Sequence, residues 1–302
     1  MKAYLLIFTS LFFLACNTAI HDKTQKKVIV CTTGMLGDAV ENIVKDNFEV
    51  ITLMGAGVDP HLYKATHGDI SALSKADIII YNGLHLEGKM GEIFQKLANR
   101  KKIIVASDAI SPSKLINNTD FAGATDPHIW FDVELWSEVV LYLGNQIGDY
   151  YPEYKEELNK NTKDYHQSLL DLNMQLLKTI NSLDSSKRIL ITAHDAFGYF
   201  GRAYSFQVKG LQGISTVSEY GLKDVSNLVK YISEHKIKAV FVESSVSDRS
   251  LKAVVEGCKS NGHQVKIGGT LYSDAMGESN TPEGTYIGML SYNVNTIVNN
   301  LK

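Results

Sequence analysis

The sequence predicts an α/β protein of two lobes, each a parallel sheet covered by helices, joined by one long rigid α-helix. Short apolar runs alternate with helical patterns before residue 110 and again after residue 187. This alternation is typical of parallel sheets covered by helices. Between the two sets lies one long stretch with a helical apolar stripe and no internal glycine or proline.

The chain has 302 residues, which is long enough for two ordinary domains. The pattern divides it into five parts. We expect a signal peptide at 1–15, a tether at 16–27, an N-terminal α/β lobe at 28–150, a connecting long helix at 151–184 and a C-terminal α/β lobe at 185–302.

The N-terminal segment has the pattern of a bacterial export signal. Lys2 precedes an apolar run, 3–15, that is too short to span a bilayer and has the length of a signal-peptide core. Cys16 directly follows the small residue Ala15, as in the lipobox of bacterial lipoproteins, although Phe13 replaces the usual leucine. We therefore expect a lipid anchor at Cys16. The alternative is a buried N-terminal helix with an incidental cysteine.

Eight apolar runs are candidate strands. Four belong to the first lobe and four to the second: 28–32, 49–54, 77–82 and 102–106, then 188–193, 206–211, 239–243 and 264–267.

The connecting segment is predicted to be a rigid rod. Pro152 suits the first turn of a helix, and the glutamates that follow suit its positive N-terminus. Roughly 32 helical residues would extend ~48 Å. Two lobes joined by such a helix are not expected to make a wide hinge motion.

Composition and charge exclude some classes of partner. The chain is 44% hydrophobic and 21% charged, which is the composition of a folded globular protein. Its formal charge of -3 comes from interspersed charges, so no basic stripe indicates nucleic-acid binding. Cys31 and Cys258 lie far apart in the sequence, and we expect both to be unpaired.

The tripeptide Asp-Pro-His occurs twice, at 59–61 and 126–128, although the chain has only 5 prolines. Aspartate is a good N-cap and proline fits the first helical position, so the following histidine has a fixed direction. We therefore predict that His61 and His128 are metal ligands held by a stiff backbone. For either histidine alone, a plain turn residue is an equally good interpretation.

Two further candidate ligands follow predicted strands of the second lobe. His194 ends the apolar run that begins at residue 189, at the strand end where open α/β sheets bind ligands. Asp274 lies in a glycine-rich loop after the run "QVKIGG". The four positions are 66 to 80 residues apart and form no local chelate. Three imidazoles and one carboxylate suit zinc and can also hold manganese.

Longer blocks of sequence carry a family resemblance. It covers the whole mature chain, in order, in the blocks "GVDPHLYKAT", "NGLHLEGKMGEIF", "DPHIWFDVELWS", "TAHDAFGYFGRAY", "VKGLQGIST", "VFVESSVSDRS" and "IGGTLYSDAMGE". These blocks resemble the TroA-like (cluster A-I) zinc- and manganese-binding solute-binding lipoproteins of metal ABC transporters.

The resemblance implies a TroA-like periplasmic binding fold with Zn2+ or Mn2+ as the transported ligand. It implies ligation by His61 and His128 from the first lobe and by His194 and Asp274 from the second. It also implies an extracytoplasmic location, a permease partner in the membrane and a monomeric protein.

Two departures from the family pattern concern the metal. The long His- and acid-rich loop of dedicated zinc carriers is missing here, while manganese-specific members have glutamate where this chain has His194. The choice between zinc and manganese therefore stays open, although such a site should hold zinc more tightly in vitro. Tyr220 also departs from the pattern, which leaves the role of Glu219 open.

Other polar residues receive secondary roles or none. Glu243, Asp126 and Asp195 are candidates for orienting the ligand histidines. We expect several other histidines to be packed or solvated: His21, His85, His166, His235 and His263.

Two other functions remain as alternatives. A metallohydrolase would need three ligands, a metal-bound water and a general base. The sequence contains none of the usual motifs of such enzymes or of phosphate-binding loops. A surface adhesin is the second alternative.

Overall fold

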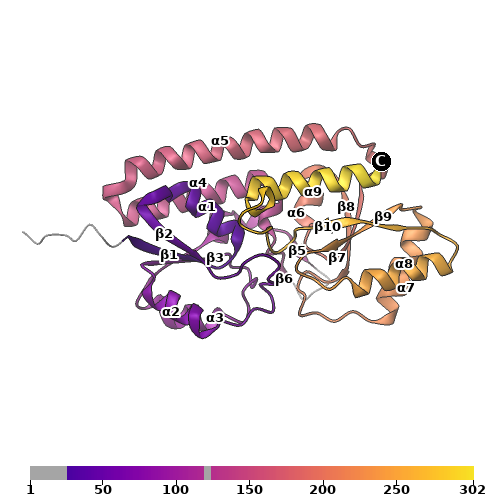
Figure 1. Ribbon diagram of the computed structural model, residues 1–302, viewed down its shortest axis with the longest axis horizontal. Coiled ribbons are helices and arrows are strands. Elements are labelled where there is room, and N and C mark those ends of the chain that lie inside the picture. The colour runs from indigo at the N-terminus through magenta and orange to yellow at the C-terminus, as the bar shows by residue number, and fades with distance from the viewer. Residues whose placement is uncertain (1–25, 119–123) are drawn as a thin grey trace, which may run out of the picture.

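The computed structural model describes residues 26–118 and 124–302. The predicted signal peptide, Cys16 and the tether up to residue 25 lie outside these residues. The predicted fold class is confirmed: two four-stranded parallel sheets lie side by side, and one long helix runs across both (Figure 1). Within the described parts of the chain, no helix has both the length and the apolar character needed to cross a membrane.

The sheet of the N-terminal lobe has the strand order β2-β1-β3-β4, and all neighbours are parallel. Ile29 and Ile78 face the core cluster that contains α1, whereas Val30 and Ile79 face the opposite cluster with α2 and α3. Strands buried on both faces explain the nearly continuous apolar runs. The elements are β1 (Lys27–Cys31), α1 (Gly34–Val44), β2 (Phe48–Thr52), α2 (His67–Lys75), β3 (Ile78–Tyr81), α3 (Gly91–Ala98) and β4 (Lys102–Val105).

The sheet of the C-terminal lobe has the order β10-β9-β7-β8 and is also parallel. Strand β10 extends beyond its predicted end at residue 267, because Gly268 and Gly269 continue the strand through an irregularity that the apolar pattern does not reveal. The elements are β7 (Ile189–His194), α6 (Gly198–Tyr204), β8 (Gln207–Gln212), α7 (Leu222–Glu234), β9 (Ala239–Glu243), α8 (Arg249–Ser260), β10 (Lys266–Leu271) and α9 (Tyr286–Leu301).

Helix α5 (Lys155–Ile180) is the predicted connecting helix, and it packs on α1, α4 (Val133–Tyr150) and α9. It has 26 residues, or ~39 Å, and is shorter than predicted because Pro152–Tyr154 forms a separate 3-10 turn. Its buried stripe contains most of the predicted apolar positions: Leu158, Tyr165, Leu169, Leu172, Leu176 and Ile180. The lobe boundaries given above remain predictions.

Short elements connect these parts. The antiparallel pair β5 (Asn117–Asn118) and β6 (Ala124–Thr125) was not predicted, and it leads directly into Asp126. The 3-10 segments are Lys45–Asn47, Ala106–Ala109, Pro112–Lys114, Ile129–Phe131, Pro152–Tyr154, Ser185–Lys187 and Pro282–Gly284.

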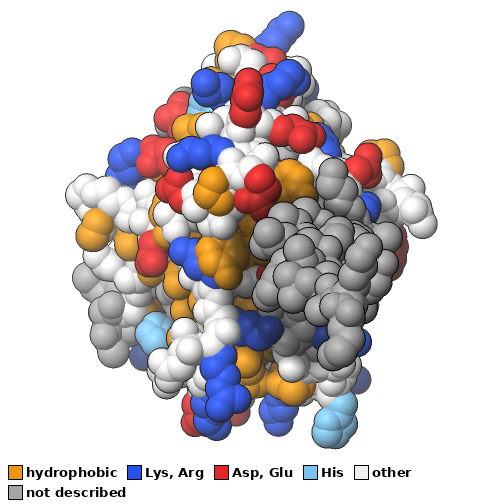
Figure 2. All heavy atoms as spheres, turned by 90° about the vertical axis from the view of Figure 1, so that its left-hand side faces the viewer, with side chains coloured by type: hydrophobic (Ala, Val, Ile, Leu, Met, Phe, Trp, Pro, Cys, Tyr) orange, Lys and Arg blue, Asp and Glu red, His pale blue; other side chains and the backbone are white. Residues whose placement is uncertain are grey.

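One hydrophobic cluster continues from lobe to lobe. Phe131 of the first lobe packs on Phe197 of the second with ring centroids 4.3 Å apart, and Trp136 stacks on Tyr286 at 5.5 Å. Cys31 and Cys258 are both buried and free, as predicted. On the face of the molecule in Figure 2, basic and acidic side chains are interspersed, in keeping with the near-balanced charge.

Candidate metal centre

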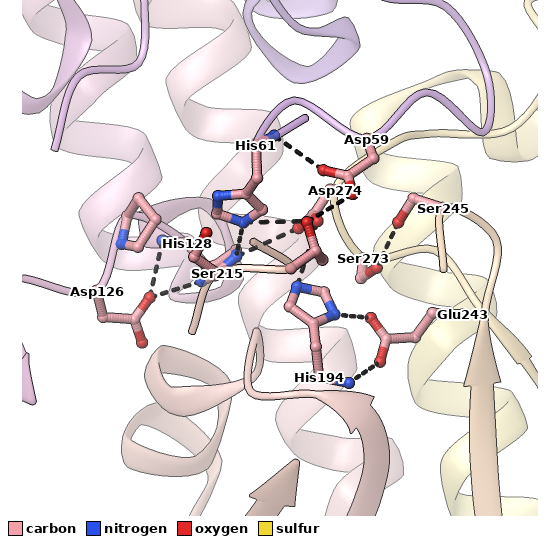
Figure 3. Close-up of polar contacts among 12 residues, drawn as sticks. Asp59, His61, Asp126, His128, His194, Ser215, Glu243, Ser245, Ser273 and Asp274 are labelled. Carbon is pink, nitrogen blue, oxygen red and sulfur yellow. Dashed lines mark hydrogen bonds and ion pairs between the residues drawn. The ribbon is translucent and has the colours of Figure 1, made fainter. Parts of the chain in front are cut away.

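The four predicted ligand residues meet between the lobes. His61 lies in the loop after β2, and His128 follows β6. His194 is the last residue of β7, and Asp274 follows β10. One potential ligand atom from each lies within 4.8 Å of all the others, and all four residues are buried (Figure 3). The carboxyl ends of the two sheets thus converge on one cluster.

The separations between ligand atoms fit a metal ion. Bonds of about 2.0–2.1 Å to a tetrahedral zinc ion place neighbouring ligand atoms about 3.3 Å apart. The Nε2 atoms of His61 and His128 are 3.3 Å apart. Asp274 places Oδ1 3.3 Å from His128 Nε2 and Oδ2 3.2 Å from His194 Nε2, while His61 Nε2 is 3.8 Å from the same Oδ2. These donor atoms surround a space of the right size for one ion.

Several of these atoms are buried without a hydrogen bond. Among the described residues, His194 Nε2 and both carboxylate oxygens of Asp274 have no partner with hydrogen-bond geometry. Buried polar groups are normally paired, and those that lack a protein partner often face an ion or a water molecule. A divalent cation would satisfy all three atoms at once.

The repeated Asp-Pro-His produces the same local turn twice. Asp59 Oδ1 accepts the backbone N–H of His61 at 2.8 Å, and Asp126 Oδ1 accepts that of His128 at 2.9 Å. Each aspartate therefore fixes the histidine two residues later. The first turn does not continue into a helix, and the second is followed by the 3-10 segment Ile129–Phe131.

Two of the three candidate carboxylates, those of Asp126 and Glu243, lie against imidazole nitrogens of the cluster. Asp126 Oδ1 lies 2.7 Å from His128 Nδ1, and Glu243 Oε2 lies 2.5 Å from His194 Nδ1. Glu243 Oε1 also accepts the backbone N–H of His194 at 2.8 Å (Figure 3). A carboxylate at Nδ1 keeps the ring proton there and leaves Nε2 free to bind a metal.

Asp195 and Glu219, whose roles the sequence left open, are not placed as Asp126 and Glu243 are. Among the described residues, no hydrogen bond joins the Asp195 side chain to a predicted ligand. Glu219 is exposed to solvent. Neither residue therefore orients an imidazole of the cluster.

Burial and the carboxylates shift the pKa values in the cluster in opposite directions. Burial lowers the pKa of His61 to about 3. Burial also disfavours protonated His128, but the carboxylates of Asp126 and Asp274 outweigh it and raise the pKa of His128 to about 9. In the same way, Glu243 and Asp274 overcome burial and hold the pKa of His194 well above its ordinary value. The carboxylates thus favour the protonated form of His128 and His194, whereas burial favours the neutral form of His61.

The loop that carries Asp274 is fixed by contacts that the sequence analysis missed. The Asn293 side chain accepts the N–H of Tyr272 at 3.0 Å and donates to its carbonyl at 2.7 Å. From the other lobe, Trp130 Nε1 donates to the carbonyl of Ser273 at 3.0 Å. The available signals were a single buried asparagine among apolar helix positions and a tryptophan two residues after His128.

The histidines that were not predicted as ligands lie outside the cluster. His85 and His235 are exposed, and His166 is half-buried on α5. His263 Nε2 lies 2.7 Å from the carbonyl oxygen of Ile237. His21 lies outside the described residues.

Comparison with known proteins identifies the family. Residues 29–300 match the family described as ZnuA, "Zinc-uptake complex component A periplasmic". The chain belongs to the ZnuA family. The match covers both lobes and the helix between them.

Two similar proteins align with this member of the ZnuA family over most of its length. The manganese-binding lipoprotein MntA of Bacillus subtilis is 48% identical over 98% of this chain and 97% of its own. The zinc-binding protein TroA of Treponema pallidum is 45% identical over 90% and 88%. The solved structure of that periplasmic zinc-binding TroA superposes with a TM-score of 0.89 over 92% of this chain and 99% of its own, at 44% identity.

Proposed function

We propose that this protein is the extracytoplasmic metal-capturing component of an ABC transporter. It binds one divalent transition metal ion, zinc or manganese, through His61, His128, His194 and Asp274. It then delivers the ion to the membrane permease. The observation that carries this proposal is the buried cluster of three imidazoles and one carboxylate, contributed equally by the two lobes.

The geometry favours a carrier over a hydrolase. A catalytic zinc ion keeps an open position for water, whereas a binding site can use four protein ligands and close completely. Here four donors converge, and three of the four residues have exposed fractions of only 0–2%. A buried cluster with four protein donors suits binding rather than catalysis.

Zinc and manganese are the two candidates for the transported ion. MntA is named for manganese and TroA for zinc, and both align with nearly all of this chain. Imidazole-rich sites hold zinc more tightly than manganese in vitro. Which ion this protein carries depends on supply as well as on affinity.

Attachment to the membrane completes the proposal. Cys16 carries the lipid anchor after cleavage of residues 1–15, and residues 16–27 form the tether. Support comes from the lipobox-like sequence and from relatives such as MntA that are named lipoproteins.

Calorimetric titration with zinc tests the metal site. A structural zinc site contributes about 10–16 kcal/mol, so one of four ligands contributes about 3 kcal/mol, or a factor of roughly 100 in affinity. We expect one ion per chain, and His194→Ala should bind at least about 100-fold more weakly while keeping its fold. His235→Ala, which changes an exposed histidine of the same lobe, is the control. Unchanged affinity of His194→Ala would refute the assignment.

A further inference from the structure

The two Asp-Pro-His turns differ in one contact. In the second turn, Asp126 Oδ1 accepts the backbone N–H of His128 and also faces its ring. In the first turn, Asp59 Oδ1 holds the backbone N–H of His61 (Figure 3), but Oδ2 accepts the hydroxyl of Thr216 at 2.6 Å. Thr216 lies 157 residues further along the chain, in the loop after β8. One carboxylate thus joins the two lobes beside a predicted metal ligand.

The loop that carries Thr216 is in turn attached to the strand next to His194. In the parallel pairing of β7 with β8, Gln212 stands opposite His194. The Gln212 side-chain amide donates to the carbonyls of Thr216 at 2.7 Å and Ser218 at 2.5 Å. A continuous series of contacts therefore leads from the strand that ends in His194, through Thr216, to the turn that positions His61.

The Thr216 contact is the hydrogen bond that fixes the His61 loop across the cleft. Among the described residues, no other hydrogen bond joins residues 55–66 to the C-terminal lobe. The loop does approach that lobe at Gly57, where an added Cβ would lie 3.5 Å from the carbonyl oxygen of Ser244. A van der Waals contact of this kind limits how closely the loop approaches the lobe, but it does not attach the loop to it.

His61 also lies where the cluster comes closest to solvent. It is 3% exposed, the highest value of the four predicted ligands, and the next residue, Leu62, is 50% exposed. The His61 loop thus borders solvent directly, so a movement of this loop would open the cluster. Contacts that hold the His61 loop closed therefore resist the departure of the ion.

We propose that Thr216 is a positioning residue that holds the His61 loop against the second lobe and slows metal release. We call its hydrogen bond to Asp59 the clasp. This inference rests on the proposed function, because it assigns a role in releasing the metal of that same site. The Thr216 hydroxyl acts through Asp59 and does not touch the ion. Breaking the clasp frees the His61 turn and leaves the three other ligands in place.

The direct test is the rate at which zinc leaves the protein, measured by stopped-flow transfer to a chromogenic chelator. A hydrogen bond to a charged group is worth a factor of roughly 10 or more. Thr216→Val keeps the shape but removes the hydroxyl, so we expect zinc to dissociate about 10-fold faster, with little change in the association rate. Thr216→Ser keeps the hydroxyl and should restore the slow rate.

Two other variants calibrate the measurement. Asp59→Asn can still accept the N–H of His61 but offers Thr216 a neutral partner, so its rate should be intermediate. Thr179→Val removes an exposed threonine hydroxyl on α5 and should behave as wild type. Wild-type release from Thr216→Val, or equally fast release from Thr216→Val and Thr216→Ser, overturns the clasp.

Hydrogen–deuterium exchange of the metal-free protein tests the clasp without any metal. Thr216→Val should speed exchange of the backbone amides at 57–62 and leave those of β7 unchanged. If wild-type protein binds no zinc, the proposed function fails while this measurement still decides on the clasp. Unchanged exchange at 57–62 overturns the clasp even if zinc binds as proposed.

Discussion

Glu243 offers a quantitative test of how the protein prepares a ligand, because both of its oxygens face His194. One accepts the backbone N–H at 2.8 Å and the other lies 2.5 Å from ring Nδ1. Both side chains are fully buried. The variant Glu243→Gln keeps the volume and shape of the side chain but replaces one of the two acceptors by an NH2 group.

That replacement creates a conflict among donors. His194 presents two N–H groups, and glutamine has only one oxygen to accept them. Either one N–H faces the amide NH2, or the imidazole moves its proton to Nε2, the atom that faces Asp274 at 3.2 Å. The second arrangement blocks the metal-binding nitrogen. Loss of such an orienting contact weakens metal binding 10- to 100-fold, which corresponds to about 1.4–2.7 kcal/mol.

The assay is a competition titration of zinc against a chelator of known affinity, with the fold checked by circular dichroism. Glu219→Gln makes the same chemical change at an exposed site in the same lobe and should bind zinc as wild type does. Equal zinc affinities for Glu243→Gln and wild type would show that Glu243 does not prepare His194 as described.

Two further predictions concern pH and the Asp274 loop. The pKa of His128 in the metal-free protein is raised to about 9, so zinc must displace its proton at neutral pH. The affinity for zinc should therefore rise about tenfold per pH unit for each displaced proton. Titrations at about pH 6, 7 and 8 measure this slope, and a flat profile contradicts it. Asn293→Ala leaves the half-buried N–H and C=O of Tyr272 without their partner and should cost about 2–4 kcal/mol in urea unfolding. Asn300→Ala, which breaks one contact within the same helix, should cost less than about 1 kcal/mol.

Much of the fold follows from local patterns in the sequence. Buried strands such as β1 and β7 are continuous apolar runs, and α5 has a stripe of period 3.6, so both could be recognised without tertiary information. The end of β10 could not, because two successive glycines such as Gly268 and Gly269 usually indicate a turn, whereas here the strand continues through them. Likewise, the two-residue strands β5 and β6 are too short to produce a pattern.

The candidate site also has a part that could be predicted from the sequence and a part that could not. The four predicted ligands could be selected because each follows an Asp-Pro pair or a strand, and the structure brings all four together. The contact of Asn293 had only a weak signal, an asparagine among apolar helix positions, and the contact of Thr216 had none. Thr216 meets Asp59 across 157 residues, and a threonine in a loop has no local feature that specifies so distant a partner.

Helix α9 has a consequence for the strength of metal binding. All four proposed ligand residues precede it in the chain, yet α9 supplies the asparagine that fixes the Asp274 loop and the tyrosine whose hydroxyl donates to the Trp130 carbonyl at 2.7 Å. A polypeptide that stops before residue 286 therefore has every donor atom but lacks the support that brings them together. We therefore expect a chain without this helix to bind metal more weakly than the full chain, because the loop of Asp274 loses the contacts that fix it.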